Sequence, residues 1–248
     1  MPGSYDAFAP HFDAWQQAFG GPYDALILPR LLAALGRWAP GARRLVDLGI
    51  GTGDLVVALA RRGFDVVGVD RSAPMLEVAR AKVAAAALPR PPRLLEQDLR
   101  ALAPGAPCDA AICVYTVMNQ LTADGDLAAA CAAVRDALVA GGVFLFELNL
   151  PAAYARWWQG TEMQVLGDVT VTRTHAPVPG TSCVEAEVTI RRGADVRRDH
   201  VRQRPFADAE VTAALAAAGL VALGCEGYDP FGDGPASKAL WAAQRPRA

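Results

Sequence analysis

The first 150 residues alternate between short apolar runs and longer stretches whose apolar positions have helical spacing. The apolar runs predict strands at 44–50, 64–70, 93–99, 108–116 and 143–150. The longer stretches predict helices at 23–39, 54–63, 72–90 and 124–142, the last of which ends at Gly141-Gly142. Strands that alternate with helices in this way form a parallel sheet with helices on both faces. Ligands bind such sheets at the carboxyl ends of the strands, near the point where the strand order reverses.

A different pattern begins after Pro151. Three stretches, 169–173, 183–192 and 195–204, alternate apolar and polar residues with a period of two, which is typical of antiparallel strands with one wet face. A helix at 208–220 and a strand at 239–246 follow. We therefore predict one α/β domain formed by residues 1–151 and 205–248, into which residues 152–204 are inserted as an antiparallel β cap.

Composition and charge exclude several classes of protein. The 248 residues are 52% hydrophobic and 20% charged, so the chain can bury a large core, and its formal net charge of -2 argues against nucleic acid as the main partner. The five cysteines lack CxxC spacing and the three histidines lack ligand spacing, so we expect no disulfide framework and no metal site. No apolar run approaches the ~20 residues of a membrane span, and the N-terminus does not resemble a secretory signal. We expect a cytoplasmic protein with no membrane partner, and leave open whether it is a monomer or a homodimer.

The stretch LVDLGIGTGDL, residues 45–55, places a glycine loop between a predicted strand and a predicted helix. A phosphate-binding P-loop ends in Gly-Lys-Ser/Thr, whereas Gly53 precedes Asp54 here. The loop reads GxGxG from Gly49, which differs from the GxGxxG of dinucleotide sites, and the acid at its end would repel a pyrophosphate. Asp70 ends the second predicted strand, where an acid suits the two hydroxyls of a ribose.

Five blocks in order resemble the motifs of class I S-adenosylmethionine-dependent methyltransferases. They are LVDLGIGTGDL (45–55), VVGVDRSAPMLEVAR (66–80), LLEQDLR (94–100), CDAAICVYTVMNQL (108–121) and GGVFLFELNLP (141–151). The second block carries the family's D-x-S-x-x-M-L pattern at Asp70, Ser72, Met75 and Leu76. The resemblance covers residues 1–151 and 201–248. It implies a Rossmann-like, doubly wound, mostly parallel seven-stranded sheet, with S-adenosylmethionine as methyl donor and S-adenosylhomocysteine as product.

The same resemblance implies a set of cofactor-binding residues. Asp47 would interact with the ammonium of the cofactor's amino-acid tail, Asp70 would bind the ribose hydroxyls, and Asp98 would accept a hydrogen bond from the adenine amino group. The full set is Trp15, Asp47, Gly49, Ile50, Gly51, Asp70, Arg71, Met75, Gln97, Asp98, Leu99 and Val114. For Met75 and Leu99, ordinary core packing is the competing interpretation.

A narrower resemblance involves the N-terminus. The stretch FAPHFDAW, residues 8–15, is similar to the start of small-molecule methyltransferases that include the sugar N,N-dimethyltransferases and YqeM-like proteins. Phe12 replaces a tyrosine that often helps to bind the cofactor tail in that group, and Tyr5 or Tyr23 are candidates to substitute for it. The group also carries an antiparallel insertion at the place of residues 152–204.

Methyl transfer is an in-line displacement at a carbon activated by the sulfonium, so positioning and exclusion of water supply most of the acceleration. A base assists when the nucleophile carries a proton. The candidate catalytic residues are Tyr115, Asn119, Glu147 and Asn149. His11 and His200 are further candidates, with surface or packing roles as the alternative.

The insertion carries two features that bear on the acceptor. Trp157 and Trp158 form either an aromatic wall for the acceptor or an anchor to the core. Six arginines, at 191, 192, 197, 198, 202 and 204, either attract an anionic acceptor or belong to a solvated strand face. We predict methyl transfer to a nitrogen or oxygen of a small molecule. The alternatives are an RNA-modifying methyltransferase and a non-catalytic protein that binds S-adenosylmethionine.

Overall fold

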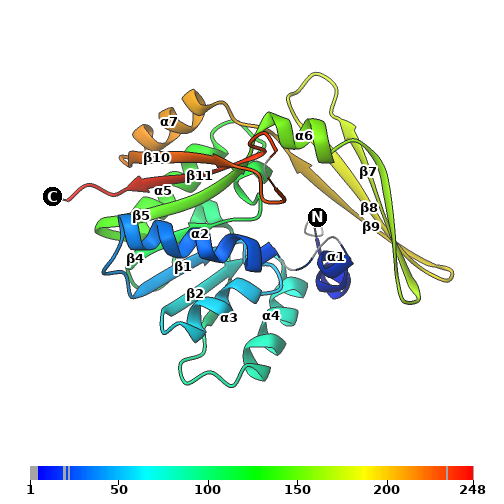
Figure 1. The fold of residues 1–248 in the computed structure, drawn as a ribbon, viewed down its shortest axis with the longest axis horizontal. Coiled ribbons are helices and arrows are strands. Elements are labelled where there is room, and N and C mark those ends of the chain that lie inside the picture. The colour runs from blue at the N-terminus through cyan, green and yellow to red at the C-terminus, as the bar shows by residue number, and fades with distance from the viewer. Residues whose placement is uncertain (1–4, 19–20, 22, 233, 248) are drawn as a thin grey trace.

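The computed structural model describes residues 5–18, 21, 23–232 and 234–247. A seven-stranded sheet has the order β10-β11-β5-β4-β1-β2-β3 (Figure 1). Its strands are β1 (Arg44–Leu48), β2 (Asp65–Asp70), β3 (Arg93–Glu96), β4 (Cys108–Cys113), β5 (Leu138–Asn149), β10 (Val221–Tyr228) and β11 (Lys238–Gln244). The first five strands are parallel, and β11 is antiparallel to both of its neighbours, β5 and β10. The strand order reverses between β1 and β4, where ligands of doubly wound sheets bind.

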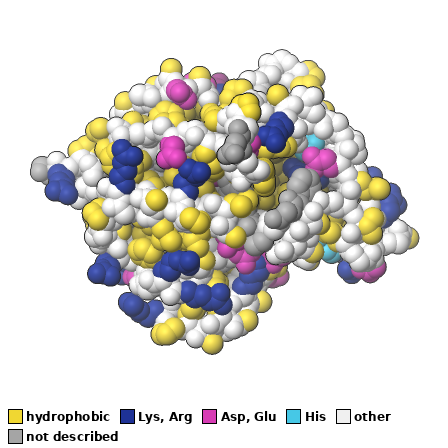
Figure 2. Space-filling model, viewed as in Figure 1, with side chains coloured by type: hydrophobic (Ala, Val, Ile, Leu, Met, Phe, Trp, Pro, Cys, Tyr) yellow, Lys and Arg dark blue, Asp and Glu magenta, His cyan; other side chains and the backbone are white. Residues whose placement is uncertain are grey.

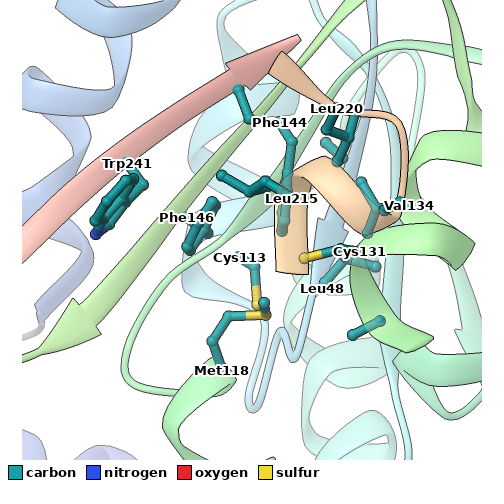
Figure 3. Packing of buried hydrophobic residues seen from close by; sticks show 14 of the residues in the cluster. Leu48, Cys113, Met118, Cys131, Val134, Phe144, Phe146, Leu215, Leu220 and Trp241 are labelled. Atoms are coloured by element: carbon teal, nitrogen blue, oxygen red, sulfur yellow. The ribbon is translucent and has the colours of Figure 1, made fainter. Parts of the chain in front are cut away.

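Helices cover both faces of this sheet. They are α2 (Tyr23–Trp38), α3 (Asp54–Arg61), α4 (Ala73–Ala85), α5 (Asp126–Ala137) and α7 (Asp208–Ala217). Strand β5 contributes side chains to the hydrophobic clusters on both faces of the sheet, because its side chains alternate between the two faces. Phe144 and Phe146 stack 4.6 Å apart, and Phe146 stacks on Trp241 (Figure 3). Val143 and Leu145 pack on the opposite face, in the cluster that contains residues of α2 and α3.

A second sheet is formed by the insertion. It is antiparallel and has the order β6 (Gly160–Leu166), β7 (Val169–Pro177), β8 (Val184–Arg192) and β9 (Asp195–Gln203); the short helix α6 (Pro151–Trp157) precedes it. The predicted alternation in β8 is confirmed, since Ala186, Val188 and Ile190 are buried. This buried face packs on the N-terminal segment rather than directly on the large sheet.

The N-terminal segment, residues 5–18, lies between the two sheets and is tied to both. It contains the 3-10 turn η1 (Ala9–His11) and the helix α1 (Phe12–Ala18) (Figure 1). The Phe8 amide donates to Asp199 of β9 at 2.9 Å, and Ser72 donates to Asp6 at 2.7 Å. Phe8 and Phe12 fill the space between, packed among apolar residues of the insertion.

Two local predictions were wrong. The helix predicted at 124–142 ends at Ala137, and Gly141-Gly142 lie inside β5 at an irregularity in its pairing with β4. Gly141 has a φ of +81°, so the glycine pair shapes a strand irregularity instead of ending a helix. Two strands were missed. In β6 the apolar Met163 and Val165 face outward, 68% and 67% exposed, which inverts the usual pattern. In β10 most residues are exposed at the sheet edge, so no apolar run marks it.

Gly53 is required by helix packing. It precedes α3 with a φ of +86°, and a Cβ at this position would lie 2.8 Å from the Cβ of Ala79 in α4. Gly63 is a matched control, because its φ is +90° and an added Cβ meets nothing within 4 Å.

We expect Gly63→Ala to lower the free energy of unfolding by about 1 kcal/mol, the cost of a left-handed alanine. Gly53→Ala adds a steric overlap between two helices and should lower it by about 3 kcal/mol. Urea unfolding of both variants measures the difference. Equal losses would show that the α3–α4 contact does not require a glycine.

Candidate functional site

Three cavities meet at the carboxyl ends of β1, β2 and β4. The strand-end cavity is lined by Gly49, Gly51, Asp70, Arg71, Gln97 and Asp98, among others. The deep cavity adjoins it and is lined by Asp47, Ile50, Thr52 and Val114, among others. The cap cavity lies toward the insertion and is lined by Trp15, Asn149, Trp157, Trp158, Arg173 and Lys238, among others. Phe12 and Tyr115 line all three, so the cavities share these two walls.

The glycine loop connects β1 to α3 in backbone conformations that favour glycine. Gly49 and Gly51 have φ values of +72° and +53°. A Cβ on Gly49 would overlap the Val117 side chain, whereas a Cβ on Gly51 would meet no atom within 4 Å. Gly49 is therefore needed for close packing. Gly51 lies beside open space, where a ligand can approach the backbone.

Asp70 ends β2 and holds the loop in place. One carboxylate oxygen accepts from the Gly51 amide at 2.8 Å, and the other accepts from the Ser72 amide at 2.9 Å. Burial raises the pKa of Asp70. Each oxygen has a further lone pair for a ligand hydroxyl, and the side chain lines the strand-end cavity.

Asp47 lies on β1, at the wall of the deep cavity. It is 1% exposed, and its Oδ2 atom has no hydrogen-bond partner among the described residues. Burial, and secondarily the charge of Asp70, raise the pKa of Asp47 to about 8. A buried carboxyl group without a partner is costly, and a cationic ligand group in the deep cavity would satisfy it.

The far end of the strand-end cavity contains the third predicted acid. Asp98 caps the 3-10 turn η2 (Leu99–Ala101), where it accepts from the Arg100 amide at 2.9 Å. The Arg100 side chain lowers the pKa of Asp98, so this carboxylate is ionised at neutral pH. Gln97 beside it exchanges two hydrogen bonds with the backbone of Ala103.

Most of the other predicted cofactor residues line these two cavities. Arg71, Met75 and Leu99 line the strand-end cavity, and Ile50 and Val114 line the deep cavity. Met75 is 3% exposed and also packs in the cluster that joins the N-terminal segment to the insertion. Trp15 lines the cap cavity instead of the other two. Tyr5 lines the strand-end cavity, while the side chain of Tyr23 lies outside the described residues.

Tyr115 and Thr116 follow β4 with φ values of +61° and +64°. Two successive non-glycine residues in the left-handed region store strain of about 1–3 kcal/mol each. The geometry directs the Tyr115 ring against Phe12, with 5.8 Å between ring centroids. Burial raises the pKa of the Tyr115 phenol, which therefore stays protonated at neutral pH.

The three other predicted catalytic residues form a polar network. Glu147 is fully buried and accepts hydrogen bonds from Lys238 and from the Tyr228 hydroxyl, both at 2.6 Å. Asn119 is also fully buried; its amide group donates to the Arg204 carbonyl and accepts from the Asn149 amide. Of these three, Asn149 lines the cap cavity. Glu147 and Asn119 line none of the three cavities.

The structure separates the arginines of the insertion. On the outer face, Arg202 makes two hydrogen bonds to Glu185, and similar ion pairs join Arg192 to Asp168 and Arg197 to Asp195. Basic and acidic side chains accordingly lie together at the tip of the inserted sheet (Figure 2). These pairs favour a solvated strand face over an acceptor site.

Sequence reasoning missed Arg173 and Glu162, which both line the cap cavity. A signal existed for Arg173, because it continues the inward face of Val169 and Val171 at a period of two.

His200 is 54% exposed and pairs with Glu185 on the outer face, and His11 lines none of the three cavities. The described residues contain no group of three His, Cys, Asp or Glu side chains arranged for a metal. No described helix has the length and hydropathy to cross a membrane.

Comparison with known proteins bears on the whole site. Residues 45–142 match a family model described as a methyltransferase domain. A protein of Geobacillus sp. (strain WCH70) that is named as a methyltransferase is 30% identical over 148 residues, which are 59% of this chain and 58% of that protein. YqeM of Bacillus subtilis (strain 168), named likewise, is 30% identical over 138 residues, 54% of this chain and 55% of YqeM. The chain thus matches a little more than half the length of these curated relatives.

Two solved structures share the fold over nearly the whole chain. An S-adenosylmethionine-dependent methyltransferase from Clostridium acetobutylicum ATCC 824 superposes with a TM-score of 0.77 at 20% identity, covering 98% of this chain and 100% of that one. CalS10 from Micromonospora echinaspora, an amino pentose methyltransferase, gives 0.72 at 25% identity, covering 94% and 96%. Residues 45–142 thus match a methyltransferase domain, and the predicted fold class, a mostly parallel doubly wound sheet with an inserted antiparallel sheet, is confirmed.

The unpaired Asp47 predicts an unusual dependence of stability on pH. Its folded pKa of about 8 lies above the ordinary value of 3.8, so the folded state holds this proton more tightly than the unfolded state does. Wild-type stability therefore falls as the pH rises from about 4 to about 8. Asp47→Asn removes this loss, and its free energy of unfolding relative to wild type should increase by about 2 kcal/mol between about pH 5 and about pH 7.

Urea unfolding at the two pH values measures the effect. Asp109→Asn is the control for the same replacement at a carboxyl group that has hydrogen-bond partners. Asp109 accepts hydrogen bonds from the Arg43 and Arg44 amides, so its replacement should destabilise the protein. A pH-independent difference between Asp47→Asn and wild type would show that Asp47 is already ionised in the folded protein.

Proposed function

We propose that this chain transfers the methyl group of S-adenosylmethionine to a nitrogen or oxygen nucleophile of a small molecule. The observation that carries the proposal is the buried carboxyl group of Asp47, whose Oδ2 atom has no hydrogen-bond partner among the described residues. It lines a cavity that shares Gly49 and Gly51 with the cavity lined by Asp70. When bound, S-adenosylmethionine supplies a methyl group on a sulfonium, whose departure leaves a neutral thioether, S-adenosylhomocysteine.

The residues present fit this cofactor from end to end. Asp47 provides a negative charge for the ammonium of the amino-acid tail, and the open space beside Gly51 leaves room for the tail against the backbone. Asp70 accepts hydrogen bonds from the two ribose hydroxyls with its free lone pairs. Asp98 accepts from the adenine amino group, and Arg71, Met75 and Leu99 surround the ring.

We assign the acceptor to the cap cavity and regard residues 152–204 as its cover. The volume of the cavity, about 340 Å³, lies in the range of small-molecule sites, ~300–1,000 Å³. Aromatic side chains dominate its walls, which lowers the local water content and strengthens electrostatic contacts. The likeness to CalS10, an amino pentose methyltransferase in its S-adenosylmethionine-bound form, supports a small acceptor.

Of the four predicted catalytic residues, Tyr115 and Asn149 are the ones that we retain. Tyr115 lies at the wall common to the cofactor and acceptor cavities, and its protonated phenol orients the nucleophile by a hydrogen bond. Asn149 contacts the acceptor from the end of β5. Glu147 acts instead through Lys238, because its carboxylate is held by that ammonium and by Tyr228. This makes Glu147 a positioning residue rather than a base.

Binding of S-adenosylhomocysteine by isothermal titration calorimetry tests the cofactor. Wild-type protein should bind it, and Asp70→Ala should weaken binding by about 1–3 kcal/mol through the loss of the ribose hydrogen bonds. Asp65→Ala is the matched control, since Asp65 begins the same strand and pairs with Arg44 on the surface. An unchanged affinity in Asp70→Ala would remove the ribose assignment.

Methyl transfer is tested with a metabolite extract and S-adenosylmethionine that carries a labelled methyl group. We expect a labelled small molecule in the mass spectrum, and less of it with the Asp70→Ala variant at a cofactor concentration that does not saturate the variant. Labelled RNA instead of a labelled metabolite would favour an RNA-modifying enzyme. Tight cofactor binding without any labelled product would favour a non-catalytic role.

A further inference from the structure

Arg173 projects into the cap cavity from the inner face of the inserted sheet. It lies on β7 directly opposite Glu162 of β6 in the strand pairing. Its guanidinium carbon lies 4.9 Å from the ring centroid of Trp15 and 5.8 Å from that of Trp158. The side chain is 16% exposed, so this charge is largely removed from water.

Within the described part of the chain, this guanidinium donates no hydrogen bond. Its charged neighbour is Glu162, with 3.8 Å between Nη1 and Oε2, too long for a hydrogen bond. A guanidinium has five N–H donors in a fixed fork, and burying them without acceptors is costly. The outward-facing Arg202 of the same sheet shows the contrast, because it makes two hydrogen bonds to Glu185.

The two other described cations at the cavity wall are already paired with acids by hydrogen bonds, which Arg173 is not. Lys238 is held by Glu147, and Arg156 is paired with Asp229 at 2.9 Å. Glu162 is the one acid among the described lining residues, and burial raises its pKa. Because burial disfavours the charged form of Glu162, this acid opposes an incoming anion less than an exposed carboxylate would.

We propose that the acceptor is an anionic small molecule whose carboxylate or phosphate binds the guanidinium of Arg173 while its flat apolar part contacts Trp15 and Trp158. Two oxygens of one anionic group match the guanidinium fork, which gives the acceptor a fixed orientation. The nucleophile then lies at the other end of the acceptor, toward Tyr115. This inference rests on the proposed function, since it names the acceptor class of that site.

The test uses probes that share a ring and differ in charge. Indole-3-acetate, indole-3-acetamide and tryptamine are titrated into the 248-residue protein in the presence of S-adenosylhomocysteine, with isothermal titration calorimetry as the readout. Benzoate and phenyl phosphate distinguish a carboxylate from a phosphate preference. We expect at least one of the acids to bind, and indole-3-acetate to bind at least tenfold more tightly than the amide, about 1.4 kcal/mol.

Arg173→Gln should lower the affinity for the acids at least tenfold and leave that for the neutral amide unchanged. Arg173→Lys should lower the affinity for the acids less than Arg173→Gln does. Lysine keeps the positive charge but lacks the forked N–H donors of the guanidinium. Arg198→Gln is the matched control, since Arg198 lies on the outer face and also has an acidic neighbour at 3.8 Å. The affinity for S-adenosylhomocysteine should be the same in all of these variants, which also shows that each is folded.

Three results overturn the proposal. They are equal binding of the acid and the amide, unchanged binding of the acids by Arg173→Gln, and failure of every acid to bind the wild-type protein. Tighter binding of tryptamine than of indole-3-acetate, lost in Glu162→Gln, would replace the anion site by an amine site at Glu162. Failure of the proposed function is distinct, because it is a failure to bind S-adenosylhomocysteine, which is measured without any acceptor.

Discussion

The hydrogen bond from the Gly51 amide to Asp70 is the contact on which the site depends. It joins the loop after β1 to the end of β2, the two strand ends that face the cofactor cavities. Asp47 lines the deep cavity together with Gly49 and Gly51, and burial, with the charge of Asp70 second, raises its pKa. The backbone contact of Gly51 thus fixes the position of the Asp70 carboxylate, which we propose as the ligand of the ribose. The left-handed conformations of Gly49 and Gly51 are the requirement for making it.

Some buried polar groups in this molecule have hydrogen-bond partners in the part of the chain that the structure describes, and others do not. Glu147 is held by Lys238 and Tyr228, and Asp199 is held by the amides of the N-terminal segment, so these groups stabilise the scaffold. Asp47 is 1% exposed and its Oδ2 atom has no hydrogen-bond partner among the described residues, whereas the Arg173 side chain is 16% exposed and faces Glu162 at 3.8 Å. Asp47 lines the deep cavity, and Arg173 lines the cap cavity. Because a buried polar group without a hydrogen-bond partner is costly, a ligand that supplies a partner at either residue would offset that cost.

The order of strands and helices up to residue 150 could be predicted because buried parallel strands are continuous apolar runs. The rule that a glycine pair ends a helix failed at Gly141-Gly142, where the pair forms an irregularity within β5. Strand β6 was missed because its apolar residues face outward, and periodicity cannot show which face of an edge strand is covered. For the site, motif positions indicated the residues that line the cofactor cavities. The partners of Glu147 come from β10 and β11, about ninety residues later, and no local pattern indicates such a pair.

The link between the insertion and the large sheet explains how two distant sequence segments make one site. Gln203 at the end of β9 donates to Thr116 at 2.9 Å, and the Arg204 amide donates to the Asn119 carbonyl at the same distance. These contacts join the last strand of the insertion to the strained turn that carries Tyr115. The strain at Tyr115 and Thr116 persists because the surrounding contacts over-determine it. These contacts therefore fix the position of Tyr115, which lines all three cavities, relative to the insertion.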